Sequence, residues 1–81
     1  MERLGLRFFE IMDIFMEIKI NGGKREYAGP AVLGDLLRSL GVSPKSVAVE
    51  RNMKILARSE IEFEPVESGD SFEIIRLVGG G

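Results

Sequence analysis

Hydrophobic and polar side chains alternate along the stretch from Ile14 to Ile20. Isoleucine or methionine takes each even position and two charged residues take odd positions, which is the period of a half-buried β-strand. The next three residues, Asn21-Gly22-Gly23, tolerate the positive φ angles that tight hairpin turns require. Residues 24–28 are therefore predicted to form the returning strand, and the fold is expected to begin with a β-hairpin.

The second regular pattern has the spacing of an amphipathic helix. Gly29 and Pro30 interrupt the hairpin, and proline suits the first turn of a helix because its missing N–H would have no partner there. One face of a helix over residues 31–40 would carry Val32, Leu33, Leu36, Leu37 and Leu40. Gly41 is expected to end this helix in a left-handed conformation.

Shorter patterns complete the chain. Strands are predicted over residues 46–50, 54–57 and 72–78, turns over 51–53 and 68–70, and irregular structure over 58–65. A hairpin followed by a helix and further strands is an α+β arrangement in which a sheet packs on a helix. The order predicts a ubiquitin-like β-grasp fold, with a mixed sheet of four to five strands packed on one main helix.

The N-terminal residues fit two patterns equally well. The even-numbered apolar residues of 1–13 would extend the first strand, whereas one side of a helix would carry Leu4, Phe8, Ile11, Met12 and Phe15. We therefore divide the chain into an N-terminal extension of undefined structure at 1–15, a β-grasp domain at 16–78 and a flexible glycine tail at 79–81.

Composition narrows the possible chemistry. The 81 residues suffice for one domain, and the absence of cysteine and histidine excludes disulfides, thiol nucleophiles, zinc sites built on these residues and Ser-His-Asp triads. A net charge of −2 argues against nucleic-acid binding, and no apolar run approaches the roughly 20 residues of a membrane span. Charged residues interrupt the apolar N-terminal stretch, so we expect no signal peptide and a cytoplasmic location.

Three carboxylates form a candidate cluster before the last strand. Glu60, Glu62 and Glu64 would share one face of an extended segment, where they could hold a hard cation. A solvated face is the favoured interpretation, and no metal site is expected.

The C-terminal residues carry the strongest functional signal. Three glycines follow the last predicted strand directly, and without Cβ atoms they could thread a narrow channel and present a carboxylate to a partner. A frayed tail is the alternative. If Phe72 and Ile74 face the core, Ile75 and Leu77 must face outward as a docking patch, unless residues 1–13 cover that side of the sheet.

Several segments resemble one protein family in their order and spacing. They are Met16-Glu17-Ile18-Lys19-Ile20-Asn21-Gly22, Asp35-Leu36-Leu37, Val47-Ala48-Val49-Glu50-Arg51-Asn52, Arg58, Gly69-Asp70, Glu73-Ile74 and Val78-Gly79-Gly80-Gly81. Together they resemble the ThiS sulfur carriers of thiamine biosynthesis, within the wider ThiS/MoaD β-grasp group. The resemblance covers residues 16–81 and leaves residues 1–15 outside the family pattern.

This resemblance implies a carrier protein that has no catalytic residue and binds no cofactor of its own. A ThiF-like adenylating enzyme would use MgATP to activate the Gly81 carboxylate, and a persulfide donor would convert it to a thiocarboxylate. A ThiG-like thiazole synthase would then take the sulfur. Gly79 and Gly80 would form the access arm, and the expected partner interface is Ile75, Leu77 and Val78. A separate expectation is that the acidic surface of Glu60, Glu62 and Glu64 meets a basic groove on the adenylating enzyme.

Three alternatives stay open at this point. MoaD, the small subunit of molybdopterin synthase, shares the tail chemistry, but its members typically have paired prolines before the glycines. The segment Ile75-Arg76-Leu77-Val78 has none, which favours ThiS. The other two alternatives are a ubiquitin-like protein modifier and a β-grasp interaction module whose tail is never activated.

Overall fold

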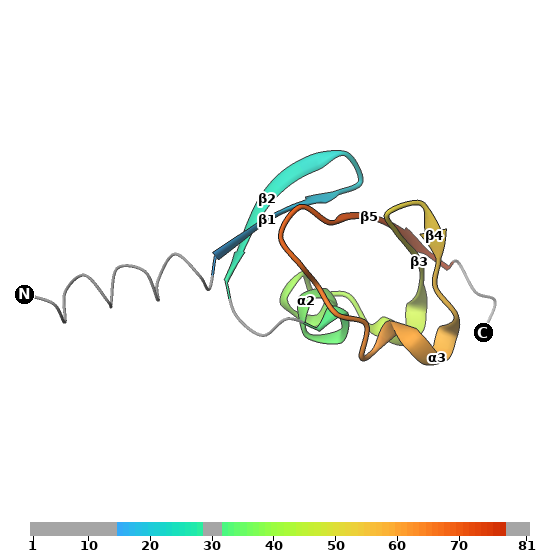
Figure 1. The fold of residues 1–81 in the computed structure, drawn as a ribbon. Coiled ribbons are helices and arrows are strands. Elements are labelled where there is room, and N and C mark those ends of the chain that lie inside the picture. The colour runs from blue at the N-terminus through green and yellow to red at the C-terminus, as the bar shows by residue number, and fades with distance from the viewer. Residues whose placement is uncertain (1–14, 29–31, 78–81) are drawn as a thin grey trace, which may run out of the picture.

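The computed structural model describes residues 15–28 and 32–77, and these form a mixed five-stranded sheet with one main helix. The strand order is β2-β1-β5-β3-β4, with β1 parallel to β5 and all other pairs antiparallel (Figure 1). The strands are β1 (Phe15–Ile20), β2 (Gly23–Ala28), β3 (Val47–Arg51), β4 (Lys54–Ile55) and β5 (Ser71–Arg76). The predicted β-grasp architecture is confirmed.

The predicted opening hairpin is also confirmed. Strands β1 and β2 pair from Phe15 opposite Ala28 to Ile20 opposite Gly23, and the turn places Asn21 and Gly22 at φ angles of 50° and 85°. The Asn21 side chain extends the sheet beyond the end of β1. Its Oδ1 accepts the Ile74 N–H at 2.7 Å and its Nδ2 donates to the Ile74 carbonyl at 3.2 Å. The Asn21 side chain thus makes the hydrogen bonds to β5 that a backbone residue of β1 would make if the strand continued.

Helix α2 (Leu33–Ser39) supplies the centre of the core. Its leucines pack against one face of the sheet, and the fully buried side chains are Phe72, Ile18, Leu33, Leu36, Leu37, Val47, Val49 and Val66. Gly41 follows the helix at a φ angle of 76°, as predicted, and its N–H donates to the Arg38 carbonyl at 2.9 Å.

The helix begins later than predicted because Val32 is extended and pairs with Pro65. The first helical N–H groups of Leu33 and Gly34 donate to the carbonyls of Glu64 and Glu62 at 2.7 and 3.0 Å. The loop that crosses the start of α2 therefore accepts hydrogen bonds from its first free N–H groups, and no side chain forms a cap there.

The prediction of irregular structure over residues 58–65 is wrong for the first part of this segment. Arg58–Ile61 forms a short helix, α3, which lies on the same side of the sheet as α2 (Figure 1). Its Glu60 Oε1 accepts the Ala57 N–H at 2.7 Å, and Ile61 is buried in the core. Strand β4 is correspondingly shorter than the predicted 54–57, because Leu56 turns inward and its N–H donates to the Val49 carbonyl at 3.0 Å.

The three glutamates of this region consequently do not share a face. Glu60 caps α3, Glu62 forms an ion pair with Arg38, and Glu64 forms one with Arg51. Each carboxylate has its own partner inside the protein, which corrects the expectation of a common solvated or cation-binding face. Among the residues described here, no group of three or more acidic side chains is arranged to hold a metal ion.

Arg51 braces the loop that leads into β5. Its guanidinium binds three carboxylates: Asp70 at 2.9 Å, Glu67 at 2.9 Å and Glu64 at 3.1 Å. Asp70 is buried and also accepts hydrogen bonds from Asn52 Nδ2 at 2.9 Å and from the Glu67 N–H at 2.8 Å. This network ties the loop to the end of β3.

The Asp70 carboxyl is held in its charged form. Its burial favours the neutral form, but the hydrogen bonds from Asn52, the Glu67 N–H and Arg51 outweigh burial and lower the pKa of Asp70 below its ordinary value. Arg51 and Asn52 therefore stabilise the fold. Arg58 does so too, since its guanidinium donates to the Lys45 carbonyl at 2.6 Å.

Candidate functional site

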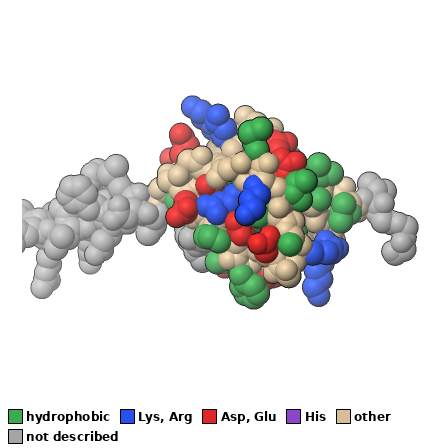
Figure 2. Space-filling model, turned by 45° about the vertical axis from the view of Figure 1, so that its right-hand side comes forward, with side chains coloured by type: hydrophobic (Ala, Val, Ile, Leu, Met, Phe, Trp, Pro, Cys, Tyr) green, Lys and Arg blue, Asp and Glu red, His purple; other side chains and the backbone are tan. Residues whose placement is uncertain are grey.

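The candidate site lies at the end of β5, where the chain leaves the sheet. Ile75 is 60% exposed and Leu77 is 48% exposed, whereas Phe72 is fully buried and Ile74 packs against the core. The predicted outward orientation of Ile75 and Leu77 is confirmed. Figure 2 shows one face of the molecule, on which hydrophobic side chains lie at the surface among acidic and basic ones.

This end of β5 is supported by one neighbouring strand. Strand β1 pairs with β5 only at Ser71 and Phe72, while β3 follows β5 as far as Arg76. The Leu77 N–H then donates to the Ser46 carbonyl at 2.9 Å, which continues the β3 side of the ladder by one residue. The segment just before the tail is therefore held in place along β3.

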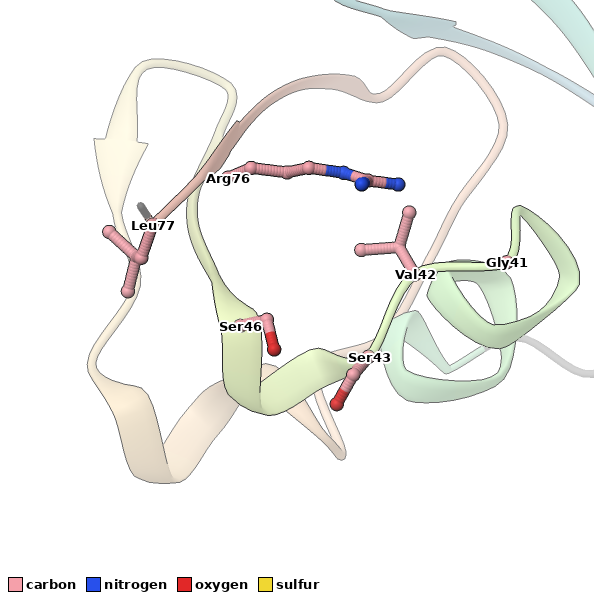
Figure 3. Close-up of a pocket in the computed structure, with 6 residues that line it drawn as sticks. All are labelled: Gly41, Val42, Ser43, Ser46, Arg76 and Leu77. Carbon is pink, nitrogen blue, oxygen red and sulfur yellow. The ribbon is translucent and has the colours of Figure 1, made fainter. Parts of the chain in front are cut away.

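A small polar cavity lies beside this segment, on the helix side of the sheet. It has a volume of about 230 Å³ and is lined by Gly41, Val42, Ser43, Ser46, Arg76 and Leu77. Figure 3 shows the Arg76 side chain extending from β5 across the cavity toward Val42. The lining offers hydroxyl groups and one guanidinium but no carboxylate, so the cavity can bind polar groups without supplying an acid or base.

A second, more apolar hollow lies on the outer face of the sheet. It has a volume of about 180 Å³ and is lined by Ala48, Val49, Glu50, Ile55, Glu73 and Ile75. Ile55 is 73% exposed and was not singled out from the sequence. The adjacent pair Ile55-Leu56 could have indicated it, because only one of two neighbouring side chains in an extended segment faces the core.

The tail residues Val78, Gly79, Gly80 and Gly81 lie outside the described residues, as do residues 1–14. Phe15, which the sequence assigned to the extension, is the first described residue of β1. The domain boundaries, the tail and the partner-interface role of Ile75, Leu77 and Val78 remain predictions. Within the described part of the chain, no helix is long and apolar enough to cross a membrane.

Comparison with known proteins identifies the family. Residues 18–81 match the family profile of ThiS. The chain belongs to the ThiS family. A solved structure titled as the thiamine biosynthesis protein ThiS from Geobacter metallireducens superimposes with a TM-score of 0.67 at 30% sequence identity. The match covers 82% of this chain and all of the Geobacter chain, so the family resemblance seen in the sequence is confirmed together with the fold.

Two curated relatives are larger proteins. A thiazole synthase from Paramagnetospirillum magneticum is 39% identical to this ThiS-family chain over 66 residues, and one from Magnetococcus marinus is 33% identical over 66 residues. In both cases the match covers 82% of this chain but only 20% of the relative. The chain therefore spans about one fifth of the length of these relatives.

Proposed function

We propose that this ThiS-family chain is a sulfur carrier for the formation of the thiazole ring of thiamine, with Gly81 as the residue that carries the sulfur. The observation behind the proposal is the family match, which extends through the terminal glycines to residue 81. The described geometry supports it, because Ile75 in β5 and Leu77 just after the strand are exposed, and one residue, Val78, separates Leu77 from those glycines.

The chemistry follows from the properties of a carboxylate, which is a poor electrophile until it is activated. A ThiF-like adenylating enzyme with MgATP would join the Gly81 carboxylate to AMP and release pyrophosphate. A persulfide would displace AMP from the acyl carbon, and a thiol would then cleave the S–S bond and leave a thiocarboxylate. The glycine arm would raise the effective concentration of this sulfur at the next active site.

Thiazole synthase is the expected acceptor of the sulfur. The two curated relatives carry that name and contain a segment similar to this chain within a longer polypeptide. Joining of a carrier-like segment to a thiazole synthase in one chain supports a working relationship between the separate proteins. The carrier would present its sulfur, and the synthase would supply the catalytic groups.

Intact-mass spectrometry tests this function. We expect the chain, incubated with its adenylating enzyme, MgATP, a persulfide donor and a thiol, to gain the mass difference between sulfur and oxygen. The same measurement on protein from the native host establishes whether the polypeptide ends at Gly81. A protein that forms no adenylate with MgATP and the enzyme would contradict the proposal, and a conjugate through a lysine of another protein would indicate a modifier instead.

A further inference from the structure

Two glutamates face each other on the outer surface of the sheet, and the described part of the chain places no positive charge against them. Glu50 on β3 lies directly opposite Glu73 on β5, and side chains at such positions share a face. Like charges placed in this way destabilise a sheet. Among the residues that the structure describes, neither carboxylate forms an ion pair or a side-chain hydrogen bond.

A second glutamate pair on the same face shows a different arrangement. Glu17 lies opposite Glu26 in the β1–β2 hairpin, but the next pair along the same face is Lys19 opposite Lys24. The two negative charges therefore have two positive charges as their neighbours along the same face, and the repulsion within each pair is compensated. The row next to Glu50 and Glu73 is Ala48 opposite Ile75, which offers no positive charge. Lys19 is in register with Ser71 on β5 and forms no ion pair with Glu73.

Two isoleucines beside this glutamate pair are also exposed to solvent. Glu50 and Glu73 line the 180 Å³ hollow together with Ile55 and Ile75, whose exposed fractions are 73% and 60%. We call these four residues and Ala48 the β3–β5 patch. An arginine of another protein fits this combination, because its guanidinium binds carboxylates through two donors while its methylene groups pack on aliphatic side chains.

We propose that the β3–β5 patch is the docking surface for the thiazole synthase, and that the synthase places an arginine between Glu50 and Glu73 beside the two isoleucines. This inference rests on the proposed function and specifies its partner surface. The patch continues from Ile75 in β5 to the exposed Leu77 just beyond the strand, the last residue described before the tail. Docking there would hold the synthase next to the glycine arm. In the free carrier the two carboxylates repel each other. An arginine between them would replace this repulsion by attraction, which makes the free energy of binding more favourable.

The test compares two matched double variants of the full chain. Glu50→Gln/Glu73→Gln removes the β3–β5 carboxylates, and Glu17→Gln/Glu26→Gln removes the same charge from the same face of the sheet. Affinity for the thiazole synthase of the same organism is measured by calorimetry at low and high salt. We expect the first variant to bind about tenfold more weakly or worse and to lose most of its salt dependence. The control variant should stay within about twofold of the wild type.

Urea unfolding separates binding from folding. Because the substitution relieves a like-charge pair, Glu50→Gln/Glu73→Gln should unfold at the same or a higher urea concentration than the wild type. Weaker binding by a protein that is no less stable would support a direct contact. Ile55→Ala should also weaken binding, since it removes exposed aliphatic surface from the patch.

Other outcomes would overturn the inference. If the synthase binds the β3–β5 variant as tightly as the wild type, or binds both double variants equally weakly, the result would contradict the docking surface. A loss of affinity for the adenylating enzyme alone would assign the patch to that enzyme instead. A concentration-dependent dimer of the free carrier that the β3–β5 variant abolishes, or Mg²⁺ binding at the two glutamates, would assign the patch to self-association or to a cation. Thiocarboxylate formation is measured on the same samples. If the wild type forms it while the variants bind normally, the docking surface is wrong and the carrier function stands.

Discussion

At the scale of single residues, Gly34 shows how a packing requirement overrides helix propensity. Gly34 is buried in the first turn of α2, where the loop after α3 crosses the helix. A Cβ atom built at this position would lie 2.6 Å from the Glu62 backbone carbonyl oxygen, closer than such contacts occur. Glycine is therefore needed because the loop backbone approaches the helix closely, although its φ angle is an ordinary one.

Replacing Gly34 by alanine should destabilise the protein. Helix propensity alone would make the substitution favourable by about 1 kcal/mol. Displacement of the Glu62 backbone should outweigh that gain and reduce the free energy of unfolding by about 1–3 kcal/mol. Urea unfolding measures the difference. Ser39→Ala, an exposed substitution in the same helix, serves as the control, and a more stable Gly34→Ala protein would disprove the close approach.

Asp70 should contribute a stability that depends on pH. Its folded pKa lies below the ordinary value of 3.8, so its contribution is complete above that value and is lost as the pH falls through the lower folded pKa. We expect Asp70→Asn to reduce the free energy of unfolding at neutral pH by about 1–3 kcal/mol, because it removes a buried, hydrogen-bonded charge. The loss is limited because Arg51 keeps its ion pairs with Glu64 and Glu67. The variant should lose less further stability than the wild type when unfolding is followed below pH 4. An unchanged acid dependence would contradict this assignment.

At the scale of elements, β5 has two faces with separate tasks. Phe72 is fully buried in the core, whereas Ile75 faces solvent, as does Leu77 just after the strand. The alternation of side chains along a strand makes this division possible within six residues. One face stabilises the domain, and the other is available to a partner.

Substitutions on the two faces of β5 should therefore have opposite consequences. Phe72→Ala should reduce the free energy of unfolding by about 3–5 kcal/mol, which removes much of the stability of a domain this small. Ile75→Ala should change it by less than about 1 kcal/mol and weaken binding to the thiazole synthase. Thermal unfolding and calorimetric titration distinguish the two effects. Normal partner binding by Ile75→Ala would argue against the outer face of β5 as the interface.

At the scale of the whole molecule, the folded domain leads into the tail that would carry the chemistry. Leu77 follows the end of β5, is exposed, and is the last described residue before Val78 and the glycines. Under the proposed function, the folded part would present the chain end and identify the partner. The reactive group would be the Gly81 carboxylate itself.

A one-residue extension tests that division of tasks. A recombinant chain ending at Gly81 should be adenylated and converted to the thiocarboxylate, whereas the same chain with a leucine after Gly81 should not be. The extension moves the carboxylate and adds a Cβ that a narrow channel would exclude. Pyrophosphate release and intact mass measure the two steps, and unfolding in urea should be unchanged. Normal loading of the extended chain would contradict the role of Gly81.

Much of the fold could be predicted because its main elements have clear local signals. The β1–β2 hairpin follows from alternation and the Asn21-Gly22-Gly23 turn, and α2 follows from its leucine spacing. The outward orientation of Ile75 and Leu77 follows from the parity of the last strand. Helix α3 was missed because four residues are about one turn, too few to establish a helical period.

The sequence by itself determined the elements with a repeating period, the family pattern and the apolar residues that β5 turns outward. Only the tertiary structure decided which charges meet. Arg51 reaches three carboxylates between 13 and 19 residues away, and Glu50 is brought opposite Glu73 across two strands. A local pattern records how each side chain is oriented within its own element. The neighbours of a charged group depend on how distant elements pack, and no local period encodes that arrangement.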